Sequence, residues 1–488
     1  MTTIPHDVAN WIGGQACPAT GGQWLDKVSP VDGRVLCRVA RSGAEDVRAA
    51  VSAAREAQTP WAEKTAVARG DLVREIALAM RARRQEIAEW VAQETGKSVK
   101  LALGETDAAI EMGMFVAGEG RRLYGRTTTA SMPHRTVMTV RQPLGVAGLI
   151  ISFNTPLPNI AWKVFPAILC GNTAVLKPSE DTPLSAWIFG RICAEVGLPA
   201  GVLNIVQGYG REAGQPIVES PGVDLVSFTG SRETGRLIQE AAGKRLAKVC
   251  LELGGKNALV VCDDADLDNA LHWVLQAAFS NAGQRCAAAS RIVIFDSIYD
   301  KFRAMLVAAT QALKVGTADT DFMGPVINAR QLEKMTAAVQ AAAAQGARIL
   351  AGGDRMRDEA HARGCYMSPT LLENAAPDAE ISRTELFGPV ATLYRVSGFD
   401  EALALANHSP YGLTAAIHTA NLHRAMRFAE KVQAGVVVVN GGTHGSEPHM
   451  GFGGVKDSGT GWREAGVEAL DVYSDWKYVN YIINPSRT

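Results

Sequence analysis

Val146-Ala-Gly-Leu-Ile-Ile151 is the first of four short apolar segments that decide the fold of this chain. The other three are TAVLK (173–177), VLNIVQ (202–207) and VDLVSF (223–228), and a stretch of helix length follows each one. Strands that helices cover on both faces consist of nearly continuous Val, Ile and Leu. The alternation therefore predicts an α/β fold with a doubly wound parallel sheet.

A second alternation follows after Gly255. Apolar segments at 257–265, 291–297, 414–419 and 435–440 are separated by helical patterns such as LDNALHWVLQAAF (267–279). This pattern predicts a second α/β domain. Upstream of both, residues 45–118 repeat apolar positions every three or four residues, which predicts amphipathic helices.

Two further segments, 126–141 and 471–483, are typical of extended chain but lie apart from the strand and helix alternation. We expect them to pair outside the main sheets. Because an isolated hairpin is only marginally stable, such a pair favours association between subunits.

Composition narrows the class of protein. A chain of 488 residues is too long for one compact core, so two or three domains are expected. Lys and Arg number 49 against 50 Asp and Glu, which argues against a nucleic-acid or acidic-membrane partner and favours a small molecule. The eight cysteines show no CxxC spacing, and neither a secretory signal nor an apolar run of 18 residues is present. We therefore expect a cytoplasmic protein with no membrane contact.

Two glycine loops are candidates for a dinucleotide site, since phosphates bind at the helix N-termini of such sheets. Gly208–Ala213 fits the GxGxxG/A pattern, and Gly230–Gly235 fits only a looser GxxxxG. Periodicity alone favours the first loop. Either loop is also explained as a tight turn between strand and helix.

Cys286 is a candidate nucleophile. It lies in NAGQRCAAAS among small residues, and the adjacent Arg285 favours the thiolate, the form that attacks a carbonyl carbon. A buried, inert cysteine is the alternative.

Glu252 and Asn154 are candidates for proton transfer and for hydrogen bonding to an oxyanion. Glu252 lies in the apolar VCLELGGKN, where burial raises a carboxyl pKa towards the range of a general base, although pairing with Lys256 is the plainer explanation. Asn154 in SFNTPLPN follows a strand, where its amide is either a fixed donor or part of a turn.

Taken together, SFNTP, TAVLKPSEDTP, SFTGS, LELGGKN, GQRC and ELFGPV resemble, in that order, the aldehyde dehydrogenase superfamily. The resemblance extends from SPVDGRVLCRVA (29–40) to GFGGVKDSGTG (451–461). It implies a Rossmann-like NAD-binding domain (1–125 and 143–255) and an α/β catalytic domain (256–465). It also implies a small β oligomerisation element (126–142 and 466–488) in a homodimer or homotetramer.

The resemblance also assigns roles to residues. Cys286 matches the nucleophile, Glu252 the general base and Asn154 the oxyanion amide. The matching cofactor-binding residues are Phe153, Lys177, Ser179, Glu180, Gly230, Ser231, Gly235, Leu253, Glu385 and Phe387. The looser loop is thus the phosphate site in place of Gly208–Ala213, and no metal is implied. A carboxylate at Glu180 accepts hydrogen bonds from ribose hydroxyls and repels a 2′-phosphate, so NAD is expected and NADP stays possible.

The same resemblance implies an aldehyde tunnel lined by Asn159, Trp162, Arg285, Ala287, His444, Ser446 and Phe452. Trp162 and Phe452 suit a flat or aliphatic body, while Asn159 and His444 suit a phenol, hydroxyl or carboxylate. His444 is equally explained as an exposed loop residue. Aromatic aldehydes and short semialdehydes both stay open as substrates.

The implied reaction begins with attack of the Cys286 thiolate to form a thiohemiacetal. Donors to its oxyanion, Asn154 and the Cys286 N–H, typically contribute about 3 to 4 kcal/mol each. Hydride transfer to the nicotinamide leaves a thioester, which water activated by Glu252 hydrolyses. Relatives that use coenzyme A typically lack this glutamate.

Several points stay open at this stage. Lys163 and Glu464 lie near positions sometimes assigned to proton relay, but Trp462 departs from the usual pattern beside Glu464. The alternative activities are an NADP-preferring semialdehyde dehydrogenase and a non-redox cysteine acyltransferase. A structural or binding protein on the same fold is a further alternative, although such relatives usually lose the nucleophile or the base.

Overall fold

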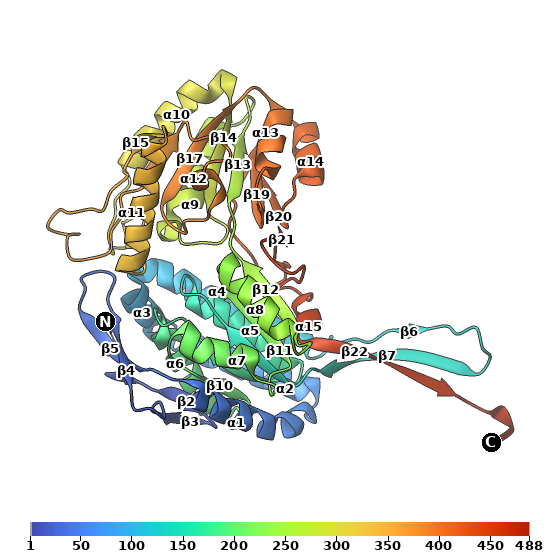
Figure 1. The fold of residues 1–488 in the computed structure, drawn as a ribbon. Coiled ribbons are helices and arrows are strands. Elements are labelled where there is room, and N and C mark those ends of the chain that lie inside the picture. Colours follow the sequence, from blue (N-terminus) through green and yellow to red (C-terminus); the bar gives the residue numbers. More distant parts are fainter. Residues whose placement is uncertain (1, 488) are drawn as a thin grey trace.

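The computed structural model describes residues 2–487, which form two lobes, each built on a seven-stranded sheet (Figure 1). Neighbouring strands in the first sheet run β12 (Lys248–Leu253), β11 (Leu225–Gly230), β8 (Val146–Ile150), β9 (Thr173–Lys177), β10 (Leu203–Ile205), β2 (Asn10–Ile12) and β3 (Gln15–Cys17). Pairs from β12 to β10 are parallel, whereas β2 and β3 add to the edge antiparallel. The predicted doubly wound parallel sheet is confirmed.

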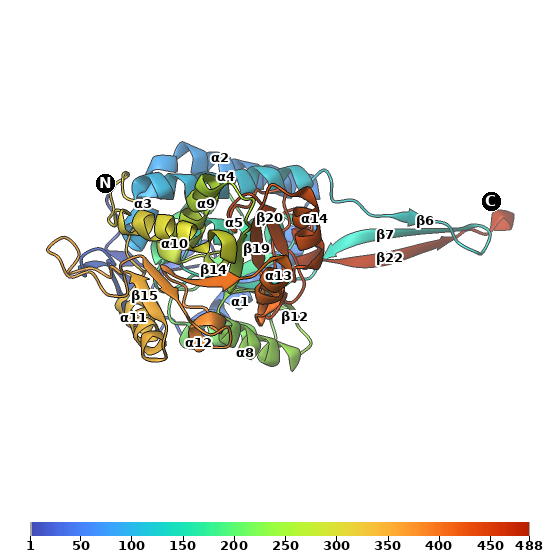
Figure 2. The ribbon, with the colours of Figure 1, turned by 90° about the horizontal axis from the view of Figure 1, so that it is seen from above.

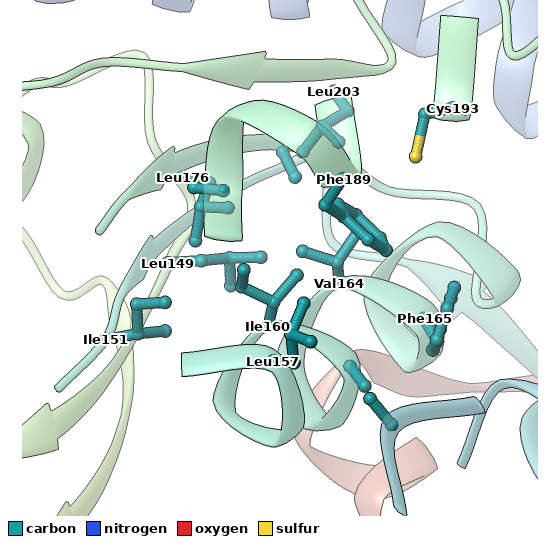
Figure 3. Packing of buried hydrophobic residues seen from close by; sticks show 14 of the residues in the cluster. Leu149, Ile151, Leu157, Ile160, Val164, Phe165, Leu176, Phe189, Cys193 and Leu203 are labelled. Carbon is teal, nitrogen blue, oxygen red and sulfur yellow. The ribbon is translucent and has the colours of Figure 1, made fainter. Parts of the chain in front are cut away.

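Helices cover both faces of this sheet. One face carries α2 (Ala66–Ala82), α3 (Arg84–Thr95), α4 (Val99–Glu119), α5 (Pro156–Leu169) and α6 (Pro183–Glu195). The other carries α1 (Ala44–Ala62), α7 (Gln215–Glu219) and α8 (Arg232–Gly243). Figure 3 shows Leu157, Ile160 and Val164 of α5 gathered with Leu149 and Leu176 of the strands. This packing holds α5, and with it the segment that precedes it, against the sheet.

The second lobe repeats the arrangement and confirms the second α/β domain. Its sheet runs β15 (Arg348–Ala351), β16 (Thr370–Glu373), β17 (Val390–Val396), β14 (Ala289–Phe295), β13 (Asn257–Val261), β19 (Thr414–His418) and β20 (Val436–Val439), and only β15 is antiparallel. One face is covered by α9 (Leu267–Phe279), α10 (Asp296–Gln311), α11 (Ala329–Ala344) and α12 (Glu380–Arg383), and the other by α13 (Phe399–Asn407) and α14 (Leu422–Lys431).

A third sheet projects away from both lobes, as two perpendicular views show (Figures 1 and 2). It consists of β22 (Ser474–Ile482), β7 (Arg135–Pro143) and β6 (Thr127–Thr128), all antiparallel. The two extended segments predicted to pair outside the main sheets therefore pair with each other. Its apolar side chains are exposed, including Tyr478 at 68% and Ile482 at 68%.

Smaller elements complete the fold. Near the N-terminus, β1 (Asp7–Val8), β5 (Val35–Ala40) and β4 (Trp24–Val28) form a three-stranded sheet. In the C-terminal region, β18 (Tyr411–Gly412) pairs with β21 (Val455–Lys456), and α15 (Ala469–Val472) packs against α5. None of the helices in residues 2–487 has an apolar stretch long enough to cross a bilayer.

Candidate active site

The predicted phosphate loop lies where two neighbouring strands of the first sheet end. Gly230 at the end of β11 is in register with Leu253 at the end of β12. Ser231 follows and caps α8, and its Oγ accepts a hydrogen bond of 3.3 Å from the Thr234 N–H. A Cβ atom at Gly235 would lie 2.6 Å from Leu253, so only glycine lets α8 approach β12 this closely. A helix N-terminus of this kind can bind a phosphate group.

The other glycine loop does not form such a site. Residues 210–214 form a π-helical turn before α7, and a Cβ atom at Gly208 would lie 3.0 Å from the Ser42 backbone nitrogen. Gly208 has a φ of +123°, a conformation that favours glycine. This loop is a tight packing turn, the alternative that the sequence also offers for it.

Lys177 is the last residue of β9, and Glu180 lies beside it in the turn that follows. The Lys177 Nζ donates to a Glu180 oxygen over 3.3 Å, and the Ser179 hydroxyl accepts from the Asp181 N–H within the turn. Burial lowers the pKa of Lys177. Glu180 is 28% exposed and lines a cleft of about 1220 Å³ that Tyr209 also borders. An exposed carboxylate beside a buried ammonium suits the hydroxyls of a ribose.

The ELFGPV segment (385–390) docks on the Gly-Gly turn after β12. An oxygen of Glu385 accepts a 3.0 Å hydrogen bond from the Gly255 N–H, and burial raises the pKa of this carboxyl to about 7. Any side chain on Gly254 would overlap the Glu385 carboxyl group. The rings of Phe387 and Phe153 pack edge to face with their centroids 5.6 Å apart. The Phe387 backbone has a φ of +60°.

These groups fit a dinucleotide along the ends of β8, β9, β11 and β12. They offer a capped helix N-terminus, a carboxylate for ribose hydroxyls and two aromatic rings beside a buried carboxyl group. Within residues 2–487, no group of three or more His, Cys, Asp and Glu side chains is placed to hold a metal ion.

Cys286 lies in a strained loop between α9 and β14. Asn281 and Ala282 both have a φ of +55°, and each such non-glycine residue typically costs about 1 to 2 kcal/mol. The loop persists because the Asn257 amide donates to the Cys286 and Ala288 carbonyls over 2.7 and 2.9 Å. The Cys286 side chain is half-buried and packs against a small apolar cluster.

The environment of Cys286 keeps the thiol protonated at rest. Burial, with the Glu385 and Glu252 carboxyl groups, raises its pKa to about 12, while the Ala287 N–H and Arg285 act in the opposite direction. Arg285 does favour the thiolate, as the sequence predicts, but burial and two carboxyl groups outweigh it. The predicted direction of the Arg285 effect is therefore confirmed, although it is smaller than the effect of burial.

Glu252 is a buried carboxyl group at the end of β12, beside the phosphate loop. In the described chain, neither of its oxygens has a hydrogen-bond partner. Burial and then Glu464 raise its pKa well above the ordinary range, against the effect of Lys163. The alternative, pairing with Lys256, is not realised, and burial lowers the pKa of that lysine to about 7. An unpaired carboxyl group near a thiol is equipped to exchange a proton.

Asn154 is held on both sides. Its carbonyl accepts from Lys97 Nζ over 3.0 Å and from the Asn281 amide over 3.1 Å. The Asn159 amide donates to the Asn154 side-chain oxygen over 3.3 Å, and to the Ser152 carbonyl over 3.3 Å. The Asn154 amide nitrogen makes no hydrogen bond to any residue in 2–487, and Asn159 is engaged with the Asn154 side-chain oxygen.

The predicted tunnel residues divide into two groups. The ring centroids of Trp162 and Phe452 lie 5.5 Å apart, and both rings pack with Cys286 and Ala287 in one apolar cluster. His444 is half-buried, so the alternative that it is an exposed loop residue is wrong. Burial and Arg285 lower the pKa of its imidazole to about 4. Ser446 lies exposed on the same loop.

Lys163 and Glu464 form an ion pair buried behind Glu252. The Ser227 hydroxyl joins the pair at 2.7 Å from Lys163 Nζ and 2.8 Å from a Glu464 oxygen. Glu464 also pairs its backbone with Phe452 across an isolated bridge. Although Trp462 departs from the usual sequence pattern of the family, Glu464 still lies beside Lys163.

Sequence reasoning missed three residues that hold this site, namely Lys97, Asn257 and Asn281. Asn257 ends the LELGGKN motif and Asn281 begins NAGQRC, so their positions within motifs were a usable signal. Lys97 lies far from any quoted motif, and only the contact of α4 with α5 brings it to Asn154.

Comparison with known proteins agrees with this geometry. The sequence pattern of the aldehyde dehydrogenase family matches residues 17–479. The alpha-ketoglutaric semialdehyde dehydrogenase of Bacillus subtilis is 37% identical over 98% of this chain and 99% of its own. The alpha-ketoglutarate semialdehyde dehydrogenase of Haloferax volcanii is 37% identical over 96% of this chain and 98% of its own.

Solved structures give the same result. Betaine aldehyde dehydrogenase from Staphylococcus aureus, crystallised with NAD+, superposes with a TM-score of 0.96 at 34% identity, covering 98% of this chain and 95% of that one. A putative aldehyde dehydrogenase from Burkholderia cenocepacia superposes with a TM-score of 0.95 at 38% identity, covering 98% of both chains.

Proposed function

This chain belongs to the aldehyde dehydrogenase family, and from that membership we propose how its residues oxidise an aldehyde to a carboxylic acid with NAD. Cys286 is the nucleophile, Glu252 the general base and Asn154 a donor to the oxyanion. The cofactor is held by Phe153, Lys177, Ser179, Glu180, Gly230, Ser231, Gly235, Leu253, Glu385 and Phe387. The substrate lies among Asn159, Trp162, Arg285, His444 and Phe452.

Acylation begins when the Cys286 thiol loses its proton and the sulfur attacks the aldehyde carbon. This proton passes to solvent, so Glu252 is free to act in the later step. The free Asn154 amide N–H donates to the oxyanion of the thiohemiacetal. When bound, NAD supplies the hydride acceptor. Loss of hydride from the former aldehyde carbon leaves a thioester on Cys286.

Deacylation needs an activated water, and the ionised form of Glu252 removes a proton from that water as it attacks the thioester. The observation that carries this proposal is the buried Glu252 carboxyl group, which has no hydrogen-bond partner among residues 2–487 and raises the pKa of the Cys286 thiol. The products are the free thiol and a carboxylic acid.

The finer assignments are also proposals. Residues 1–125 and 143–255 bind NAD, residues 256–465 carry the nucleophile, and residues 126–142 and 466–488 join subunits in a homodimer or homotetramer. Exposed apolar side chains on the projecting sheet support this association. The enzyme acts in the cytoplasm. The names of two relatives make a semialdehyde a candidate substrate beside aromatic aldehydes.

Steady-state kinetics of wild type and Cys286→Ala with aromatic, aliphatic and semialdehyde substrates test the proposal. We expect NADH formation by wild type, faster with NAD than with NADP because of Glu180, and loss of at least about 10³-fold in the variant. A Cys286→Ala enzyme at wild-type rate refutes the nucleophile. Acyl transfer without NADH formation would instead identify an acyltransferase.

A further inference from the structure

Arg285 is a charged residue of the predicted tunnel whose side chain contacts no carboxylate within residues 2–487. Its side chain makes no hydrogen bond or ion pair to any residue in 2–487, and its Nε is buried without a partner. Buried arginines are otherwise hydrogen-bonded here: Arg291 donates to the carbonyls of Lys256 and Ala406. A guanidinium withdrawn from water and left without acceptors is costly unless a ligand supplies them.

The charges around Arg285 leave an excess of positive charge. Glu105 is the carboxylate that favours its charged form, but Glu105 already pairs with Lys97 at 2.5 Å. Two cations therefore share one buried carboxylate. His444 adds no charge, because burial and Arg285 keep it neutral at pH 7.

The carboxyl groups on the other side of Cys286 do not cancel this excess. Burial raises the pKa of Glu385 to about 7 and raises that of Glu252 further, so both tend towards the neutral form. Trp162 and Phe452 line the same region with apolar surface. The region thus combines apolar walls, a free guanidinium and a neutral imidazole.

We propose that the aldehyde oxidised by this enzyme carries a carboxylate, which binds the free guanidinium of Arg285. The substrate class is a short aldehyde acid, the semialdehyde of a dicarboxylic acid, and this inference rests on the proposed function. A guanidinium presents parallel N–H donors that match the two oxygens of a carboxylate. The His444 ring, with its Nδ1 unpartnered within residues 2–487, supplies a neutral hydrogen-bonding group in the same region.

Arg285 then has a specificity role at a residue adjacent to the nucleophile. Because Cys286 follows it directly in the chain, a carboxylate bound at Arg285 brings the aldehyde end of a short chain to the sulfur. An uncharged aldehyde of the same length leaves the guanidinium unpaired and loses this interaction.

The test compares 4-oxobutanoate with its methyl ester, which lacks the negative charge and is larger by one methyl group. We expect wild type to favour the acid by about 100-fold in kcat/KM, mostly through KM. In Arg285→Gln the ratio of acid to ester falls to near one, and in Arg285→Lys it is intermediate. Arg427→Gln, which removes an exposed arginine paired with Asp400, keeps the wild-type ratio.

Each outcome is decisive. Equal kcat/KM for acid and ester in wild type, or an unchanged ratio in Arg285→Gln, overturns the inference. If Arg285 acted only through the Cys286 thiol, both substrates would slow equally and the ratio would stay, which also overturns it. Failure of wild type to oxidise any aldehyde would refute the proposed function instead.

A measurement on wild type alone covers the case in which the variants do not fold. Butanoate should compete with butanal in the NADH assay, whereas butanamide, of the same shape without the charge, should not. Equal inhibition by the two compounds would overturn the inference.

Discussion

Glu252 and Glu464 are two buried glutamates that influence each other but have opposite surroundings. Glu252 is 5% exposed and has no hydrogen-bond partner in the described chain, whereas Glu464 is 2% exposed and binds Lys163 and Ser227. Burial is nearly the same for both. The difference lies in the partners, and it separates a reactive carboxyl group from one that holds two segments of chain together.

The comparison shows why a proton acceptor lies beside an ion pair. For Glu464, the Lys163 cation and the Ser227 hydroxyl replace the hydrogen bonds to water that burial removes. Its unpaired neighbour takes up a proton, since burial penalises the charged form and the Glu464 charge adds repulsion. Cys250, two residues before Glu252 in β12, places its sulfur 3.8 Å from a Glu464 oxygen.

The largest effect is expected at Glu252. Replacing it with Gln keeps the shape but removes the base, so steady-state turnover falls by about 10³-fold. Stopped-flow measurement of NADH should still show a first turnover, because the thioester forms but is not hydrolysed. Loss of this burst together with turnover would place Glu252 before acylation. Turnover at the wild-type rate would remove it from the mechanism.

The next effect concerns stability at the ion pair. Lys163→Met leaves Glu464 buried without its cation, and we expect the free energy of unfolding to fall by about 3 to 5 kcal/mol in urea titrations. The double variant Lys163→Met with Glu464→Met should recover most of this loss. Lys431→Met, at an exposed pair with Glu430, serves as the control with a change below about 1 kcal/mol. No recovery in the double variant would mean that Lys163 acts by packing alone.

The smallest effect is the pH dependence that distinguishes the two glutamates. Below pH 4.5, the ordinary value for Glu252, the folded and unfolded chains both bind its proton. Above it the unfolded chain releases the proton first, so stability falls as pH rises, by up to about 1.4 kcal/mol per pH unit.

Glu252→Gln removes this contribution. Its apparent melting temperature relative to wild type should therefore rise between pH 5 and pH 7. Parallel curves for the two proteins would show that Glu252 is ionised in the folded state, contrary to the comparison.

Much of the fold follows from local sequence. Continuous apolar runs identify the strands of both parallel sheets, because those strands are buried on both faces. The short strands β2 and β3 have no such run, since they lie at an edge and contain three residues each. The choice between two glycine loops also needed more than local pattern, because both satisfy a turn, and only the approach of Gly235 to Leu253 separates them.

The sequence by itself determined the types of chemical group and their order along the chain: a thiol, a carboxyl group and an amide, each at the end of a predicted strand or helix. Only the tertiary structure decided which of these groups have partners. Nothing in the local sequence distinguishes Glu252 from Glu464. In the fold, however, Lys163 forms an ion pair with Glu464. Protonation and charge depend on neighbours from distant segments, and local sequence does not contain those distances.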